Sequence, residues 1–379
     1  MKKPLSIYIH IPFCLKKCLY CDFPSFSGCE NIYEQYVSTL CNEIRDNACV
    51  FSDREIQTVF FGGGTPTVLS SKNIGKIIDS VFDKYDVSSK AEITVEANPE
   101  TLNYEKLSEL KSMYVNRLSI GAQAWQDRLL QKLGRVHDRE TFVSAFHAAR
   151  QAGFKNIGCD LMFSLPTQTM DDWEETLENT LKLSPEHISA YSLIIEDNTP
   201  FKKMFESGLI SQTDDELDRK MYYLCRQMLA DKGYSQYEIS NFSKPGFESR
   251  HNIVYWQTGE YIGFGLGAHS YFEGCRFHNT LDMEKYLSSD GSFKKLHEQT
   301  EKLSENEKME EFMFMGLRMN KGIEKSEFFS RFKCDITDVY EKQLSELFEE
   351  KLIAESSGRI FLTPYGMDIS NFVFEKFII

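Results

Sequence analysis

The chain has 379 residues, of which 41% are hydrophobic and 26% charged, so it can bury a large core and form two or three domains. Its formal net charge of −14 argues against sequence-independent binding to nucleic acid and against electrostatic attachment to an anionic membrane. No apolar run is long enough to span a bilayer or to form the core of a signal peptide. We therefore expect a cytoplasmic protein that neither spans a membrane nor binds nucleic acid.

Strand-like and helix-like segments alternate over the first half of the chain. The expected strands are 5–11, 58–61, 91–96, 117–120, 156–161 and 187–193. Amphipathic helices lie between them, and one begins near Thr169, whose partner Asp172 suggests a capping box. This alternation is typical of βαβ units in a parallel sheet, which is either a doubly wound open sheet or part of a (β/α) barrel. In both folds, ligands bind at the C-terminal ends of the strands.

The pattern changes after residue 200. An amphipathic helix near 217–229 precedes an expected strand at 234–242. Helices follow from Ser304, which has Glu307 as its capping partner, and a short strand at 360–363 leads into one terminal helix. Helices with a short strand suggest a small winged-helix-like domain. Its many Glu and Asp residues argue against a role in reading DNA.

Three cysteines, Cys14, Cys18 and Cys21, form a C-x₃-C-x₂-C array directly after the first strand. Thiolates this close in sequence form disulfides or bind a soft metal centre. A structural zinc site usually takes two pairs of ligands, and the chain has no second C-x₂-C. A cubane iron–sulfur cluster normally takes four thiolates, so three would leave one iron open. The missing second pair favours the cluster over zinc.

The array resembles the signature of radical S-adenosylmethionine (SAM) proteins. That resemblance implies a [4Fe-4S] cluster whose open iron chelates the amino and carboxylate groups of SAM and passes it an electron, which yields a 5′-deoxyadenosyl radical. It also implies an α/β fold, an incomplete six-stranded (β/α) barrel. The remaining cysteines show no ligand spacing, and we expect them to be small core residues. They are Cys29, Cys41, Cys49, Cys159, Cys225, Cys275 and Cys334.

SAM presents an ammonium, a carboxylate, a ribose diol and an adenine to a binding site. The glycine turn that begins at Gly62 resembles the loop that meets the SAM ammonium. The guanidinium of Arg135 suits the carboxylate. Acidic and amide side chains at strand ends can accept hydrogen bonds from the ammonium or ribose, although each alone also fits an ion-pair role. The resemblance suggests these SAM contacts: Tyr8, Tyr20, Gly63, Gly64, Thr65, Glu96, Gln123, Arg135, Asp160 and Ile194.

Over most of its length the chain resembles the oxygen-independent coproporphyrinogen III oxidase (HemN) family. The similarity lies in six motifs: IHIPFC from Ile9, FGGGTPT from Phe61, EANP from Glu96, SIGAQ from Ser119, LGR from Leu133 and DLM from Asp160. The resemblance implies a radical SAM barrel over 1–235, a family-specific connecting region over 236–300 and a HemN-type helical domain over 301–379.

The sequence departs from the true oxidases of that family at two places. They carry a fourth cysteine two residues after the third, where this chain has Phe23, and they have an N-terminal extension before the cluster loop. The C-x₃-C-x₂-C-x-Phe pattern and the HNxxYW segment from His251 to Trp256 instead resemble the haem-chaperone group of the family, HemW. In that group the segment is linked to haem binding. Phe23 leaves the cluster ligands intact but weighs against decarboxylation of coproporphyrinogen.

His251 is the candidate haem ligand, because imidazole is a usual axial ligand and Tyr255 and Trp256 can stack on a macrocycle. A histidine beside aromatics is also a common packing residue, and cysteine-thiolate or covalent attachment of haem stays open. His10, in the strand before the cluster loop, is expected to have a structural role.

Two functions fit these motifs. The first is a haem chaperone that binds haem and passes it to acceptor haem proteins, such as membrane respiratory proteins, while carrying a [4Fe-4S] cluster and SAM. The second is an oxidase that decarboxylates two propionates of coproporphyrinogen to give protoporphyrinogen. Phe23, the short N-terminal segment and the HNxxYW segment favour the chaperone.

Overall fold

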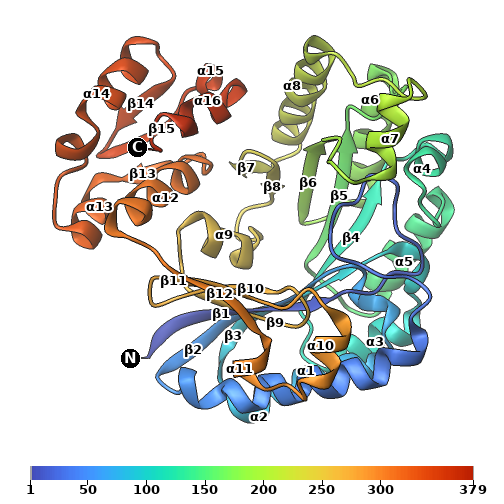
Figure 1. The fold of residues 1–379 in the computed structure, drawn as a ribbon. Coiled ribbons are helices and arrows are strands. Elements are labelled where there is room, and N and C mark those ends of the chain that lie inside the picture. The colour runs from blue at the N-terminus through green and yellow to red at the C-terminus, as the bar shows by residue number, and fades with distance from the viewer. Residues whose placement is uncertain (1, 379) are drawn as a thin grey trace.

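The computed structural model describes residues 2–378, without the side chains of residues 293 and 294. In this part of the chain, a curved sheet of twelve strands wraps around a hollow, and a smaller unit with a three-stranded sheet lies beside its open side (Figure 1). The order in the large sheet is β12-β11-β10-β9-β1-β2-β3-β4-β5-β6-β8-β7, so its two edges do not meet. The barrel is therefore open, as expected from the sequence.

Six consecutive parallel strands form the middle of this sheet. They are β1 (Lys3–Ile11), β2 (Arg54–Gly63), β3 (Asp86–Ala97), β4 (Arg117–Gln123), β5 (Ile157–Phe163) and β6 (His187–Ser192). Helices follow the strands and cover the outer face. The main ones are α1 (Tyr33–Asn47), α2 (Ser71–Lys84), α3 (Tyr104–Ser112), α5 (Arg139–Gln151), α6 (Met170–Leu183) and α8 (Asp215–Asp231). The expected strand–helix alternation is confirmed, and the capping box of Thr169 and Asp172 starts α6.

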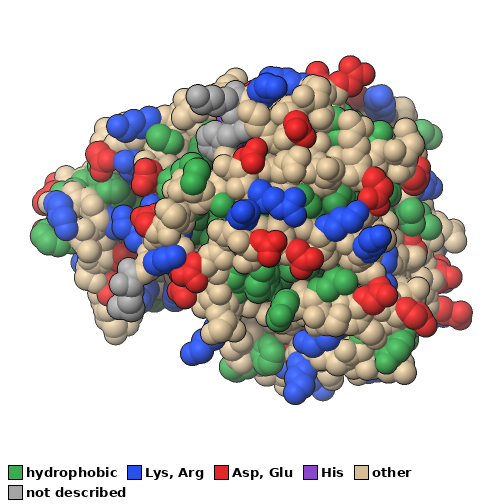
Figure 2. All heavy atoms as spheres, turned by 90° about the horizontal axis from the view of Figure 1, so that it is seen from below, with side chains coloured by type: hydrophobic (Ala, Val, Ile, Leu, Met, Phe, Trp, Pro, Cys, Tyr) green, Lys and Arg blue, Asp and Glu red, His purple; other side chains and the backbone are tan. Residues whose placement is uncertain are grey.

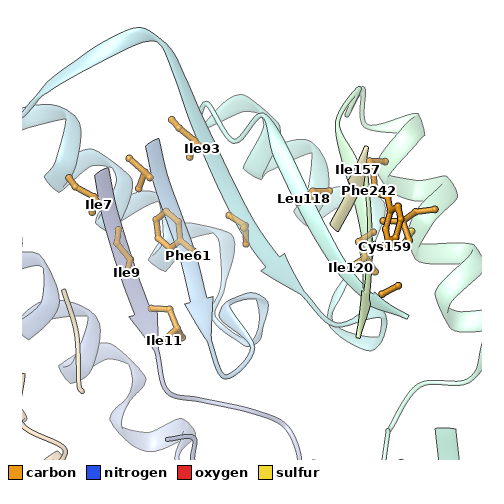
Figure 3. Close-up of a cluster of buried hydrophobic side chains, with 14 of the residues drawn as sticks. Ile7, Ile9, Ile11, Phe61, Ile93, Leu118, Ile120, Ile157, Cys159 and Phe242 are labelled. Atoms are coloured by element: carbon orange, nitrogen blue, oxygen red, sulfur yellow. The ribbon is translucent and has the colours of Figure 1, made fainter. Parts of the chain in front are cut away.

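Side chains along each strand point alternately toward the helix-covered core and toward the hollow. In β1, Ile7, Ile9 and Ile11 are fully buried beneath the helices, together with Ile120 of β4 and Ile157 of β5 (Figure 3). Successive side chains of a strand point to opposite faces, so Tyr8 and His10 point into the hollow instead. The outer face buries apolar surface, while the inner face is left for polar and aromatic side chains.

Further strands extend both edges of the parallel sheet. Beyond β1 lie β9 (Tyr261–Phe264), β10 (His269–Phe272), β11 (Cys275–Asn279) and β12 (His297–Lys302). Beyond β6 lie β8 (Asn241–Ser243) and β7 (Ser235–Glu238), both antiparallel to their neighbours. The single strand predicted at 234–242 is thus a hairpin, because the chain reverses between these two strands.

The smaller unit contains α12 (Glu305–Leu317), α13 (Lys325–Phe332) and α14 (Ile336–Glu349) with the sheet of β13 (Ile323–Glu324), β15 (Arg359–Leu362) and β14 (Ile353–Ser356). Ser304 and Glu307 form the predicted capping box. The single terminal helix predicted for 364–377 is wrong. The backbone leaves the helical conformation at Ile369, which separates α15 (Pro364–Asp368) from α16 (Ser370–Glu375).

Five short helices were not predicted from the sequence: α4 (Asp127–Leu133), α7 (Pro200–Glu206), α9 (Arg250–Trp256), α10 (Met283–Ser288) and α11 (Phe293–Leu296). Within residues 2–378, no helix has the length and apolar character needed to cross a bilayer. The face shown in Figure 2 mixes basic and acidic side chains without gathering one sign into a single patch.

Candidate functional site

The cysteine loop leaves the C-terminal end of β1 and closes over the hollow. Cys14, Cys18 and Cys21 line one cavity of about 180 Å³, which we call the cysteine pocket. Backbone hydrogen bonds fix the loop: Cys14 N donates to Phe26 O (2.9 Å), and Leu19 N donates to Leu133 O (3.0 Å). Burial raises the pKa of the Cys21 thiol to about 11, so a bound metal would have to displace its proton.

No group of three His, Cys, Asp or Glu side chains in residues 2–378 is gathered closely enough to hold a single metal ion. The three cysteines instead line the cysteine pocket without converging on one point. In a cubane cluster each thiolate binds a different iron, so the thiols need to surround a cluster rather than meet at one point. The chemistry of this sulfur donor set fits a [4Fe-4S] cluster.

The glycine turn after β2 packs directly against the cysteine loop. Gly64 N donates to Ile11 O (2.9 Å) and Thr65 N donates to Phe13 O (2.7 Å). A Cβ at Gly64 would lie 2.6 Å from Phe13 O and 3.0 Å from Cys14 Sγ. Gly63 has φ of +107°, a conformation that glycine adopts without strain. The turn therefore needs glycine for its shape and for its close approach to the cluster loop.

Three polar side chains enter the cysteine pocket from neighbouring strand ends: Glu96, Gln123 and Asp160. Loss of hydration, reinforced by the nearby Asp160, raises the pKa of Glu96 to about 8. Gln123 sits at a bulge in the β4–β5 pairing with φ of +64°, which turns its side chain toward the pocket. Asp160 accepts hydrogen bonds from Ser119, and its remaining lone pairs and those of Glu96 can accept further bonds from an ammonium or from hydroxyl groups.

Arg135 reaches the pocket from the turn that follows α4. Its Nη2 donates to Asn98 Oδ1 (2.7 Å) and Gly121 O (3.0 Å), and its Nη1 lies 3.5 Å from Cys18 Sγ. Its Nε is buried without a hydrogen-bond partner among the described atoms. A buried, incompletely paired guanidinium beside the thiols can accept an anion, such as a carboxylate.

The remaining predicted SAM contacts lie close by. Tyr20 lines the cysteine pocket and, with Tyr8 and Ile194, also lines an adjoining cavity of about 670 Å³, the lumen cavity. Ile194 is 67% exposed. The structure thus brings every predicted SAM contact to one of two adjoining cavities at the strand ends.

Only some of the other cysteines are core residues. Cys41, Cys159 and Cys225 are buried, as expected, but Cys49 is exposed. Cys29, Cys275 and Cys334 are partly exposed. Cys29 and Cys334 still pack against the core. The prediction is wrong for Cys49, which lies in the 3₁₀ helix η2 (Ala48–Phe51), and for Cys275 on the added strand β11, because neither position faces the core.

His251 lies in the first turn of α9 and is 1% exposed. Its Nδ1 is 2.7 Å from Thr58 Oγ1, its Nε2 is 2.8 Å from Tyr255 Oη, and its ring stacks on Phe60. Burial lowers its pKa to about 3, so the ring is neutral. Ligation of haem iron by His251 would require the loss of one of these hydrogen bonds. In this structure His251 is packed and hydrogen-bonded within the fold, and its role as a haem ligand stays a prediction.

His10 also has a structural role, as expected. Its Nδ1 lies 3.1 Å from Tyr8 Oη and its Nε2 lies 3.2 Å from Pro24 O. It therefore ties β1 to the far end of the cysteine loop.

A third cavity, of about 540 Å³, was not predicted from the sequence. It lies between β1, the end of α9, strands β9–β11 and α12, and we call it the aromatic pocket. Members of the HNxxYW segment and of the glycine-rich segment before His269 meet here, although neither motif alone indicated a cavity. Its walls include Tyr8, Phe23, Tyr255, Trp256, His269 and Tyr271.

Comparisons with known proteins agree with this geometry. Residues 8–179 match the family model of the radical SAM superfamily, and residues 303–369 match that of the HemN C-terminal domain. Membership of the radical SAM superfamily implies a [4Fe-4S] cluster and SAM as cofactors. Coproporphyrinogen III oxidase (HemN) from Escherichia coli has a similar structure, with a TM-score of 0.85 over 99% of this chain and 90% of that chain. At 22% identity, this similarity establishes the fold alone.

Relatives with higher identity share the full length of the chain. The protein named heme chaperone HemW from Lactococcus lactis is 38% identical over 379 residues, which cover 100% of this chain and 98% of that protein. HemW from Bacillus subtilis is 38% identical over 98% of this chain and 99% of that protein. HemW from Escherichia coli is 32% identical over 99% of this chain and 98% of that protein. The chain belongs to the HemW family of the radical SAM superfamily.

Proposed function

We propose that this protein is a haem chaperone, which binds haem, carries a [4Fe-4S] cluster with SAM, and delivers haem to acceptor haem proteins. The name shared by its full-length relatives supports the proposal. The observation that carries it is the presence of two nearby cavities of different chemistry: a polar pocket lined by thiols and a larger, mainly aromatic one. We place the protein in the cytoplasm, where thiols stay reduced.

The cysteine pocket would hold the cluster and, together with the adjoining lumen cavity, SAM. Cys14, Cys18 and Cys21 would bind the irons, and when bound the cluster supplies an electron for cleavage of SAM. Arg135, whose Nη1 lies 3.5 Å from Cys18 Sγ, would bind the SAM carboxylate beside the cluster. Glu96, Gln123 and Asp160 would accept hydrogen bonds from the ammonium and the ribose. Gly63, Gly64 and Thr65 would let the ligand approach the backbone, and Tyr8, Tyr20 and Ile194 would pack against its apolar parts.

Phe23 supports this function over the oxidase alternative. It is 58% exposed and borders all three cavities. The true oxidases resembled by the sequence have a cysteine at this position, which is a potential donor of electrons or protons. A phenyl ring offers neither, but it adds apolar surface against which a flat macrocycle can pack. The fold shared with HemN is common to both functions and cannot separate them.

An anaerobic experiment tests the proposal. The reconstituted protein is titrated with haem and followed by its Soret band, then mixed with an apo-haem protein such as apomyoglobin. We expect stoichiometric binding of haem followed by transfer. In parallel, the protein is incubated with reductant, SAM and coproporphyrinogen. Formation of protoporphyrinogen would support the oxidase instead, and failure to bind haem would rule out the chaperone.

A further inference from the structure

We propose that haem binds in the aromatic pocket, with His269 as an axial ligand of its iron. This inference rests on the proposed function and adds the location of haem and the identity of its ligand. It replaces His251, the candidate taken from the HNxxYW segment, by a residue outside that segment.

The aromatic pocket has the size and lining that a porphyrin requires. Its volume of about 540 Å³ falls within the range of ligand sites in proteins, roughly 300–1,000 Å³. Trp256, Tyr271 and Phe23 supply flat aromatic surface on several sides, and Met315 and Leu281 add aliphatic surface. Leu281 and Phe23 are both more than half exposed, so the pocket opens to solvent. An open pocket suits a ligand that must be transferred to another protein.

The position of His269 suits ligation of iron. It lies at the start of β10, is exposed, and lines the pocket together with Tyr271, two residues along the same strand. Residues at i and i+2 share one face of a strand, so both side chains face the cavity. No hydrogen bond to its imidazole is present among the described residues. His269 can therefore offer a ring nitrogen without breaking a hydrogen bond.

The other histidines near the cavity are less suited to this role. His10 lines the pocket, but both of its ring nitrogens are in hydrogen-bond contact. His251 borders the lumen cavity and is held by Thr58 and Tyr255. His278 pairs with His269 across the β10–β11 ladder, with ring centroids 5.0 Å apart, but does not line the pocket.

An arginine of the aromatic pocket can bind a haem propionate. Haem carries two propionates, and Arg276 of β11 lines the aromatic pocket directly across the ladder from Tyr271. Its Nη2 binds Glu311 Oε2 (2.8 Å), while its Nε is buried without a hydrogen-bond partner among the described atoms. The lumen cavity also holds an arginine, Arg117, beside the carboxyls of Glu96 and Asp160, so the position of His269 rather than charge distinguishes the two cavities.

The test compares single-histidine variants by haem titration with absorbance and resonance Raman spectra. We expect His269→Gly to weaken haem binding by about tenfold or more and to change the Soret and iron–ligand bands. Added imidazole should restore the wild-type spectrum, because it can occupy the space left by the side chain. His278→Ala, on the facing strand, and His147→Ala, on the outside of α5, are the matched controls and should bind haem as the wild type does.

The outcomes separate the two levels of the proposal. If the wild type does not bind haem, the proposed function fails. If it binds haem and His269→Gly leaves the affinity and spectrum unchanged, the function stands but His269 is not the ligand. If His278→Ala or His251→Gln shows the loss and the rescue by imidazole instead, that histidine is the ligand and the inference is wrong. Circular dichroism checks that each variant is folded.

Discussion

The cysteine pocket and the aromatic pocket are built in different ways. The cysteine pocket is made by loops at the ends of parallel strands, with side chains fixed by backbone contacts such as Thr65 N to Phe13 O. The aromatic pocket is made by side chains from β1, α9, the added strands β9–β11 and α12 of the C-terminal unit. The first depends on local sequence motifs, whereas the second depends on how distant segments pack. Each dependence can be tested separately.

Replacing a cluster cysteine should have the largest effect of all, the loss of the cluster. This effect should be confined to the cysteine pocket. Cys14→Ala, Cys18→Ala or Cys21→Ala is expected to abolish the iron–sulfur absorbance of the reconstituted protein, because each removes one of three iron ligands. The haem affinity of these variants should stay within about twofold of the wild type, a change well below 1 kcal/mol. Cys29→Ala is the control and should keep the cluster. Equal loss in Cys29→Ala would mean that a fourth thiolate closes the cluster.

The junction between α1 and the added strands, which carry part of the aromatic pocket, should respond to pH. Glu43 is buried where α1 meets the added strands and accepts hydrogen bonds from Tyr286 Oη (2.7 Å), Asn279 Nδ2 (2.6 Å) and Gly265 N (3.0 Å). Burial raises its pKa to about 7, above the usual value near 4.3 for glutamate in an unfolded chain. Its contribution to stability is therefore fully present below about pH 4 and is lost as pH rises through about 7.

Urea unfolding between pH 5 and pH 8 measures this effect. The free energy of unfolding of the wild type should fall relative to that of Glu43→Gln over this range, by on the order of 3 kcal/mol. The difference arises because the glutamine side chain does not titrate. A constant difference between the two proteins would show that Glu43 does not change its protonation there.

A methyl group at Gly64 should disturb the cysteine pocket. In Gly64→Ala the new Cβ would meet Phe13 O and Cys14 Sγ, so the cluster loop must shift. We expect the Kd for SAM to rise by about tenfold, which corresponds to about 1.4 kcal/mol. Gly158→Ala is the matched control, since its Cβ would have no neighbour closer than 3.4 Å. If both variants bound SAM as tightly as the wild type, the close packing at Gly64 would have no part in binding.

Phe23 borders both pockets, and we expect its replacement to have the smallest effect on ligand binding. Phe23→Ala is expected to raise the Kd for haem about threefold, through loss of one aromatic contact at an exposed edge. The iron–sulfur absorbance should stay unchanged, because the phenyl ring binds no iron. Loss of the cluster in this variant would mean that the two pockets are not independent.

Much of the fold could be predicted from the sequence, because its signals are local. The apolar runs of β1 and β2 and the capping boxes at Thr169 and Ser304 act within a few residues and gave the correct elements. The hairpin of β7 and β8 and the break at Ile369 were missed, because both depend on packing against distant parts of the chain. The strands β9–β12 were missed because they are short and have no clear alternation.

The same distinction holds for the candidate site. The cysteine pocket could be predicted because the cysteines follow β1, Gly63, Gly64 and Glu96 lie at or next to the ends of β2 and β3, and Asp160 lies within the neighbouring strand β5. The burial of the His251 side chain could not be predicted from the sequence. It depends on contacts with Thr58 and Phe60, which both belong to the distant strand β2. His269 and Arg276 stand in no recognised motif, and only the antiparallel pairing of β10 with β11 brings them to one cavity.

The central claim is that one pocket serves the cluster and SAM while the other serves haem. Its most direct test is a haem titration of the cluster-reconstituted protein with and without saturating SAM, in which bound SAM is measured alongside the Soret band. Among the described lining residues, the aromatic pocket shares only Phe23 with the cysteine pocket, and Tyr8, Phe23 and Tyr255 with the lumen cavity. Because the shared residues are walls between the cavities, we predict that one haem and one SAM bind together, each with nearly unchanged affinity. Displacement of SAM by stoichiometric haem would contradict the claim and place both ligands in the same cavity.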